Sequence, residues 1–545
     1  MCSIDRAAWR LLLAAICAPL AYSAGSAACA ECHRDIFESY RRTPMALSSG
    51  EAGRDAVETF GKASFTHAAS GFHYRVSQAG GFFQVEFARK GDAALGGKKL
   101  LRYYVGSGAV ARSYLLADDG FLYEAPVAYY TAGRNWGLAP GYEQYAYPYV
   151  TRPVSPPCLN CHASFLDVVR GTQNRFGAPP FGEGGIACER CHGPGEAHVA
   201  KMRAGETSGG AAIVNPAKLD PERRDSVCEQ CHLSGEVRVT RAGSAWSTYR
   251  PGDRLSDSVA VFVRAGTVPG MRVNSHFEKL AQSACKRASG DRLWCGSCHD
   301  PHAAPDAAQR AAWFRGKCLA CHASKGCTES AAVRARNQND CIACHMPRSP
   351  VTDAQHVVYT DHSIPRRPRG TQAGPAAEAD LVPFEGTAVS ARDTTLAYAI
   401  AAGHTTSAAF RARALRLLEQ SERAAPNDSE VLLYLAEMYR NAGREAEAEP
   451  LYRRAMQLDP GQVTASVGLG GILFERGEFA RAIALWQDAL AKNGGLVLVG
   501  TNLAMAQWRT GDVRAAGATL RRIIDLSPGF APARELLRRL ETQGR

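Results

Sequence analysis

The sequence predicts a multidomain protein: a helix-containing domain packed around cysteine–histidine motifs, a β-rich insertion in that domain and an all-α C-terminal solenoid. Three observations support this. Seven Cys-x-x-Cys-His motifs lie between residues 29 and 345, alternating apolar residues fill the cysteine-free segment 60–150, and a 34-residue period runs through 392–545. A chain of 545 residues is also longer than one core usually supports.

The repeated motif is the attachment signature of c-type haem. Two thiols bond to one edge of the macrocycle, and the next residue is then placed to bind the iron through its imidazole. Zinc sites and thioredoxin-like proteins also use Cys-x-x-Cys, but neither needs a histidine at the following position. We therefore expect seven covalent haems in a haem-packed cytochrome c domain. The motif cysteines are Cys29, Cys32, Cys158, Cys161, Cys188, Cys191, Cys228, Cys231, Cys295, Cys298, Cys318, Cys321, Cys341 and Cys344, and the proximal histidines are His33, His162, His192, His232, His299, His322 and His345.

Other histidines are candidates for the opposite, distal face of each iron. Seven lie between residues 29 and 365 outside the motifs, which would allow every haem two imidazoles. His67 and His73 fall in strand-like sequence, so ordinary sheet residues are the alternative for them. Met45, near the first motif, is a candidate thioether ligand, and simple packing is its alternative. The seven histidines are His67, His73, His198, His276, His302, His356 and His362.

The length of chain between a motif and the next histidine suggests which haem two of these histidines bind. His198 follows His192 by six residues, a span of at most roughly 20 Å, and a Gly-Pro-Gly turn shortens it. His302 follows His299 by three residues, or roughly 10 Å. Neither span suffices to pass round the edge of its own haem. We expect both histidines to bind neighbouring haems.

The stretches "CERCHGPGEAH", "CGSCHDPH" and "CIACHMP" resemble a family. They are similar to the multihaem cytochromes c related to the tetrahaem partner of hydroxylamine oxidoreductase and to the octahaem and pentahaem reductases. The resemblance covers residues 29–59 and 151–365. It implies closely stacked haems and a histidine after one motif that ligates another haem. Some of those reductases carry lysine in place of one proximal histidine, and this chain has no Cys-x-x-Cys-Lys.

The N terminus has the pattern of a secretory signal peptide, assigned to residues 1–28. Arg6 and Arg10 precede an apolar run from Leu11 to Tyr22, and small residues follow up to Ala28. Cleavage must come before Cys29; an uncleaved anchor is the alternative. We expect a periplasmic or otherwise extracytoplasmic protein without a transmembrane helix after cleavage. The formal charge of +11 does not indicate nucleic acid, because the basic residues form no tract with aromatics and the haem propionates would offset them.

The expected segments follow in chain order. A short helix from Ile36 to Arg42 belongs to the first haem segment, and Asp119-Gly120 predicts a hairpin turn in the insertion. Cys285 and Cys327 flank the last three motifs and predict a disulfide, with free buried thiols as the alternative. The segments are the first haem segment 29–59, the β-rich insertion 60–150, the six-haem domain 151–365, a linker 366–391 and the repeat domain 392–545.

The C-terminal period is the signature of tetratricopeptide (TPR) repeats. Ala414, Ala448, Ala482 and Ala516 recur every 34 residues, with Pro460 ending one helix pair. We expect three clear repeats after a degenerate first one, folding by themselves and binding a protein or peptide. A domain that only caps or dimerises the haem region is the alternative.

Closely spaced haems predict a protein that carries electrons between a redox donor and a redox acceptor. One alternative is a reductase or oxidase of small nitrogen or sulfur compounds at one open haem. The other is a scaffold, in which the repeats organise a redox complex. No catalytic residue is assigned from the sequence.

Overall fold

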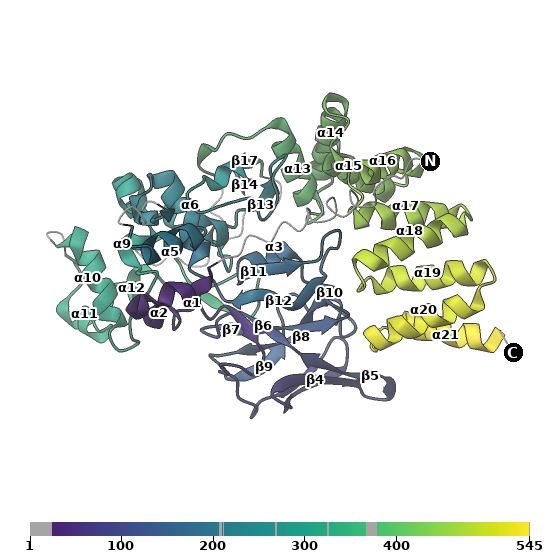
Figure 1. Cartoon of the computed structure of the whole chain (residues 1–545), viewed down its shortest axis with the longest axis horizontal. Coiled ribbons are helices and arrows are strands. Elements are labelled where there is room, and N and C mark those ends of the chain that lie inside the picture. Colours follow the sequence, from purple (N-terminus) through teal and green to yellow (C-terminus); the bar gives the residue numbers. More distant parts are fainter. Residues whose placement is uncertain are drawn as a thin grey trace, which may run out of the picture.

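The computed structural model describes residues 24–543, apart from 207–209, 211, 267–269, 324–325 and 367–378. The predicted signal peptide up to residue 23 lies outside this range. Figure 1 shows a helical region that carries most of the motifs, a β-rich region beside it and a helical solenoid along the other side. Within the described residues, no helix has the length and apolar character that crossing a membrane requires.

The β-rich region consists of two antiparallel sheets around one core. In β4 alternate residues are buried, as the sequence pattern predicts, and Phe83, Tyr114 and Trp136 meet in the core. The larger sheet extends beyond the predicted insertion, because β1 and β10 lie outside 60–150. The four-stranded sheet contains β2 (Ser64–His67), β3 (Phe72–Ala79), β4 (Phe82–Arg89) and β5 (Asp92–Leu101); the six-stranded sheet contains β1 (Ser49–Glu51), β6 (Tyr103–Val105), β7 (Ala111–Asp118), β8 (Phe121–Tyr130), β9 (Asn135–Leu138) and β10 (Arg152–Pro153).

The turn between β7 and β8 confirms the predicted hairpin. Asp119 and Gly120 have φ values of 48° and 77°, both in the left-handed region. A two-residue turn with both φ values positive matches the twist of the strands on either side, and Asp-Gly is a favoured sequence for it.

The motif-bearing region is made of short elements. Helix α2 begins two residues before the expected Ile36. The helices are α1 (Gly25–Ala30), α2 (Arg34–Tyr40), α3 (Pro156–Asn160), α4 (Glu189–His192), α5 (Glu196–Arg203), α6 (Pro221–His232), α7 (His276–Ala281), α8 (Ala284–Ser289), α9 (Cys295–Cys298), α10 (Arg310–His322), α11 (Ala331–Arg336) and α12 (Cys341–His345). The strands are β11 (Ala163–Val168), β12 (Phe176–Gly184), β13 (Val237–Thr240), β14 (Val259–Arg264), β15 (Arg348–Pro350), β16 (Val358–Thr360) and β17 (Leu381–Pro383).

The C-terminal region is all-helical, with four helix pairs and a final helix. The periodic alanines lie where paired helices cross, and Ala414, Ala448, Ala482 and Ala516 are fully buried. The helices are α13 (Ala391–Ala402), α14 (Ala408–Ala424), α15 (Ser429–Asn441), α16 (Glu445–Leu458), α17 (Val463–Glu475), α18 (Phe479–Lys492), α19 (Val497–Arg509), α20 (Val513–Leu526) and α21 (Ala531–Gln543).

The solenoid, which the sequence predicts to fold by itself, shares its core with the rest of the chain. Phe262 of β14 is buried in one cluster with Leu396 and Phe410 of the solenoid. The expected linker 366–391 contains β17, which pairs with β14. At the other end, Leu526 lies in the core of the β-rich region. Apolar periodicity within a repeat does not reveal which faces will be covered by another domain.

Candidate haem-binding site

One continuous cavity of about 3640 Å³ receives side chains from all seven motifs. A pocket for one small ligand is typically about 300–1,000 Å³, so this space suits several large groups. Every motif histidine and every motif cysteine except Cys158 lines it. We number the motifs, and the haem sites they would form, 1 to 7 in chain order, from Cys29 to Cys341.

Each motif lies in or directly beside a helix, and motifs 4 and 6 form the ends of the longer helices α6 and α10. The His33 N–H donates to the Cys29 carbonyl at 2.9 Å, and the His192 N–H donates to the Cys188 carbonyl at 3.0 Å. Residues at i, i+3 and i+4 of a helix share one face. In six of the motifs the two thiols and the imidazole face the cavity together, as attachment to one macrocycle requires. In motif 2 only Cys161 and His162 do so.

Three pairs of imidazoles face one another across the cavity. The ring centroids are 6.4 Å apart for His33 and His198, 5.9 Å for His192 and His302, and 6.2 Å for His299 and His362. With a metal–nitrogen bond of about 2 Å and a ring centre about 1.1 Å behind that nitrogen, two imidazoles on opposite faces of one iron have centroids roughly 6 Å apart. Each pair therefore fits one haem iron.

His276 is the candidate partner for His232, at a shorter separation than in the first three pairs. Its ring centroid lies 5.1 Å from that of His232 and 5.0 Å from that of His362. Burial lowers the pKa of His276 to about 3 and that of His299 to about 4. A low pKa keeps an imidazole neutral, which is the form that binds a metal. The buried Nδ1 atoms of His162 and His276 have no hydrogen-bond partner within the described structure.

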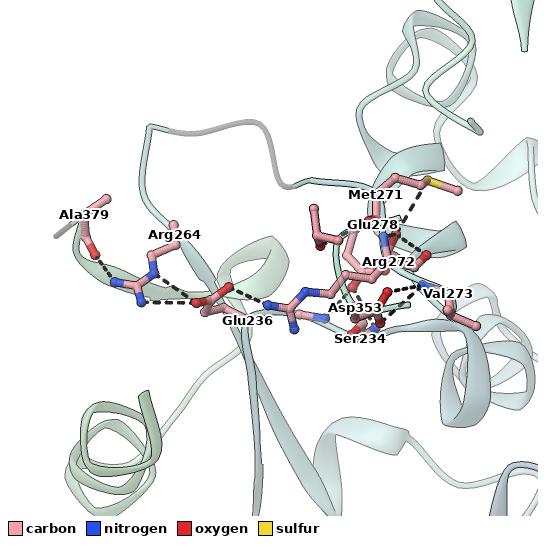
Figure 2. Close-up of polar contacts among 12 residues, drawn as sticks. Ser234, Glu236, Arg264, Met271, Arg272, Val273, Glu278, Asp353 and Ala379 are labelled. Atoms are coloured by element: carbon pink, nitrogen blue, oxygen red, sulfur yellow. Dashed lines mark hydrogen bonds and ion pairs between the residues drawn. The ribbon is translucent and has the colours of Figure 1, made fainter. Parts of the chain in front are cut away.

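Polar contacts support the start of α7, where His276 lies (Figure 2). Glu278 accepts the N–H of Ser234 at 2.7 Å, which ties α7 to the turn after His232. In the loop before α7, the Arg272 guanidinium lies 2.9 Å from Glu236. These contacts fix the distance between the segments that carry His232 and His276.

Several predicted ligands are not brought to the cavity. His67 bonds to Ser70 and His73 to Thr66 in the β-rich region, as the sheet-residue alternative describes. His356 packs edge-on against Tyr130 at 5.5 Å. None of these three histidines lines the cavity, whereas Met45 does. Four spare histidines, not seven, are therefore available there.

Aromatic side chains also line the cavity, and they are not among the residues predicted from the sequence. The Phe314 ring lies 5.5 Å from His299, and Trp294 directly precedes a motif cysteine. The Tyr40 hydroxyl donates to the Ile186 carbonyl at 2.5 Å, leaving its ring against His302. Flat apolar surfaces of this kind suit a porphyrin. Their closeness to the motifs in sequence was the available signal.

Thiols of different motifs contact one another. A hydrogen bond with Cys29 lowers the pKa of Cys188 to about 6, and one with Cys231 lowers the pKa of Cys161 to about 7. Motifs 4 and 5 meet in the same way through Cys295, whose pKa is lowered by its hydrogen bond with Cys228. The attachment edges of these neighbouring sites therefore lie close together.

The two cysteines expected to pair are free. Cys285 and Cys327 both line the cavity as thiols, so the expected disulfide is corrected. Flanking positions in sequence do not bring two β-carbons to the short separation that a disulfide needs. Among the residues that the structure describes, no group of three His, Cys, Asp or Glu side chains is arranged to hold a bare metal ion, as a zinc site would require.

Replacing His198 with alanine should change haem site 1 and leave site 3 unchanged. His198 faces His33 of motif 1, although it follows motif 3 in the chain. Loss of the distal imidazole should convert one low-spin haem to high spin and raise its potential, with covalent attachment intact. Electron paramagnetic resonance with site assignment measures this, and His73→Ala, outside the cavity, is the control. A change at site 3 would contradict the assignment.

Comparison with known families identifies two modules. Residues 144–193, which contain motifs 2 and 3, match the family described as cytochrome c554 and c-prime. Residues 408–463 and 439–495 match tetratricopeptide repeat families. The cytochrome c match implies covalently bound haem, and the repeats imply protein interaction.

One curated relative and a group of solved structures are similar to parts of the chain. "Multiheme cytochrome MtrA" of Shewanella baltica (strain OS185) is 26% identical over 161 residues, which are 27% of this chain and 46% of that protein. The chain thus spans about half the length of the curated relative it matches. The crystal structure of MamA is 26% identical, with 25% of this chain and 80% of that chain covered and a TM-score of 0.24. MamA from Desulfovibrio magneticus RS-1 is 18% identical, with 28% and 85% covered and a TM-score of 0.26. The chain combines a cytochrome c554-like segment with C-terminal TPR repeats.

Proposed function

We propose that the protein is an exported heptahaem c-type cytochrome that carries electrons between redox partner proteins. The single cavity lined by all seven motifs carries this proposal, because haems held in one space are close enough to exchange electrons. The chain's own residues would attach each haem through two thiols, bind its iron through imidazoles and exclude water. When bound, the haems supply one-electron redox chemistry.

The contacts between motifs suggest an order for the electron path. Thiol contacts join sites 1 and 3, 2 and 4, 4 and 5, and 6 and 7. Facing imidazoles join site 3 to site 5 through His302, and site 5 to the segment after motif 7 through His362. Together these links connect all seven sites, and sites 1, 2 and 6 are the ends of the network.

The solvent exposure of the motif cysteines agrees with that order. The exposed motif cysteines are Cys32, Cys158 and Cys321, which belong to sites 1, 2 and 6. A redox partner can approach a haem whose edge reaches the surface, whereas interior haems only pass electrons on. We propose that donor and acceptor dock at these ends and that the TPR region binds one of them or an accessory protein.

Haem content tests the proposal directly. The purified mature protein should retain seven haems per chain after denaturation and organic extraction, because thioether bonds survive both. A pyridine haemochrome titration with a protein assay measures this. Replacing both Cys188 and Cys191 with alanine should remove the haem at site 3 and leave the other haems attached. Five or fewer haems in the wild-type protein would contradict the proposal.

A second function is favoured by the sites that lack a facing histidine. In the described part of the chain, no second imidazole is paired with His162, His322 or His345. A haem without a strong distal ligand could bind and reduce a small nitrogen or sulfur compound. We expect four low-spin bis-histidine haems, and added nitrite or hydroxylamine should perturb only the remaining spectra if such a site exists. Spectra unchanged by both compounds would favour electron transfer alone.

A further inference from the structure

Glu189, the second residue of motif 3, is a buried carboxylate bonded to three backbone N–H groups. It accepts from Ala24 at 3.1 Å, from Gly25 at 3.3 Å and from Gly195 at 2.7 Å. Its side chain is only 7% exposed. Hydrogen bonds to a carboxylate are stronger than those between neutral groups, so this cluster is a firm link between distant parts of the chain.

The three N–H groups belong to the segments that carry two facing imidazoles. Ala24 and Gly25 begin α1, which leads into Cys29 and His33. Gly195 precedes α5, which carries His198. The His33 and His198 rings are nearly parallel, at 13°, with centroids 6.4 Å apart. One carboxylate therefore ties together the backbones that set this separation.

Neighbouring contacts hold the same segment. The Ser26 N–H donates to Glu183 at 3.1 Å, and the Cys188 N–H donates to the Ser26 hydroxyl at 3.2 Å. Residues 24–26 are therefore bonded to the β12 and motif 3 segments at every position. A chain that began after residue 26 would lose all of these contacts.

The residues just before this segment fit a processing site. Ala21 and Ser23 are small and stand three and one positions before Ala24, the spacing that signal peptidases select. Hydrolysis there adds water across the Ser23–Ala24 peptide bond. The leader leaves with a new carboxylate on Ser23, and Ala24 keeps its nitrogen, which becomes an ammonium. That nitrogen already lies 3.1 Å from Glu189.

We propose that signal cleavage falls between Ser23 and Ala24, and that Glu189 pairs with the resulting N-terminal ammonium and positions His33 and His198 at haem site 1. This rests on the proposed export and haem attachment. Opposite charges at this separation in a partly buried site attract strongly, so cleavage strengthens a contact that the backbone amide already makes. Glu189 touches no iron and acts as a positioning residue.

The N terminus of the holoprotein tests the processing step. Intact mass and N-terminal sequencing of the purified wild-type protein should show a chain beginning at Ala24. A chain beginning at Ala27 or Cys29, or one that retains the leader, would overturn the proposal. This measurement needs no variant, so it holds even where a substitution impairs folding.

Substitutions test the positioning role. Glu189→Ala should leave haem content unchanged and convert about one haem equivalent at site 1 from low to high spin in paramagnetic resonance. Glu189→Gln, which keeps the shape but loses the charge and one acceptor, should give a smaller conversion. Glu196→Gln, which removes a carboxylate in the first turn of α5, is the matched control.

The outcomes separate this proposal from the proposed function. Wild-type protein without seven haems would contradict the cytochrome proposal itself. The positioning role alone would be overturned if the wild-type protein holds seven haems and site 1 changes in His198→Ala but not in Glu189→Ala. A change in both variants, with Glu196→Gln like the wild type, supports it.

Discussion

Deleting residues 379–545 should prevent the motif-bearing region from folding and taking up its full set of haems. The deletion removes β17 from the edge of β14 and uncovers Val237, Val239 and Phe262. Burying such side chains contributes about 1.5–3 kcal/mol each. Their sum is comparable with the roughly 5–15 kcal/mol that stabilises a whole domain.

The same deletion breaks polar contacts that reach toward a haem ligand. Arg264 donates to the Ala379 carbonyl at 3.1 Å (Figure 2). Its guanidinium also lies 4.9 Å from the Phe410 ring. Arg264 in turn holds Glu236, which bonds to Arg272 in the loop before α7. Losing the solenoid should therefore loosen the segment that carries His276.

Haem content and thermal unfolding of the exported chain ending at residue 378 measure this effect. The control is a full-length chain with a protease site between Gly370 and Gly374, cut after folding. Its two fragments should stay together with haem content unchanged, because the shared core does not depend on the covalent link. A truncated chain with a full haem complement and normal unfolding would show that the solenoid is an independent domain.

Replacing Arg112 with leucine should destabilise the β-rich region by about 3–5 kcal/mol, because it leaves the buried Glu58 carboxylate without its counter-charge. Arg112 lies 3.1 Å from Glu58, and both side chains are only 1% exposed. The guanidinium also sits 3.8 Å over the Tyr104 ring, and the Tyr114 hydroxyl donates to Glu58 at 2.6 Å.

Urea unfolding of the full-length protein, followed by tyrosine and tryptophan signals, measures the loss. The double variant Arg112→Leu with Glu58→Leu should recover much of it, since no buried charge is then left unpaired. Lys98→Ala is the control, because its ion pair with Glu86 lies at the surface and should contribute less than about 1 kcal/mol. Equal losses in Arg112→Leu and Lys98→Ala would contradict the argument.

The elements that could be predicted from the sequence depend on short-range geometry. A Cys-x-x-Cys-His stretch in a helix brings its three side chains onto one face, because residues three and four positions apart are neighbours there. Asp119-Gly120 forms its turn because both residues tolerate positive φ. The 34-residue period marks small residues such as Ala448, which must be small because two helices cross there.

The distal histidines could not all be predicted from the sequence. The sequence has seven histidines outside the motifs between residues 29 and 365, one for each expected haem. Only four of them line the cavity: His198, His276, His302 and His362. The prediction for His198 depends only on chain length and a turn, and the His198 ring lies opposite His33 of another motif. His67, His73 and His356 could not be separated from the others in this way, since their surroundings come from strands distant in sequence.

Motifs, their helical turns, the hairpin and the repeat period follow from interactions among residues a few positions apart, and the linear chain contains that information. The pairing of imidazoles, the bonds from Ala24 and Gly25 to Glu189 and the core shared by Phe262 and Phe410 join residues tens to hundreds of positions apart. That Cys285 and Cys327 stay free thiols also depends on how distant segments pack. Only the tertiary structure decides these, because each depends on which buried surfaces cover one another when the whole chain packs.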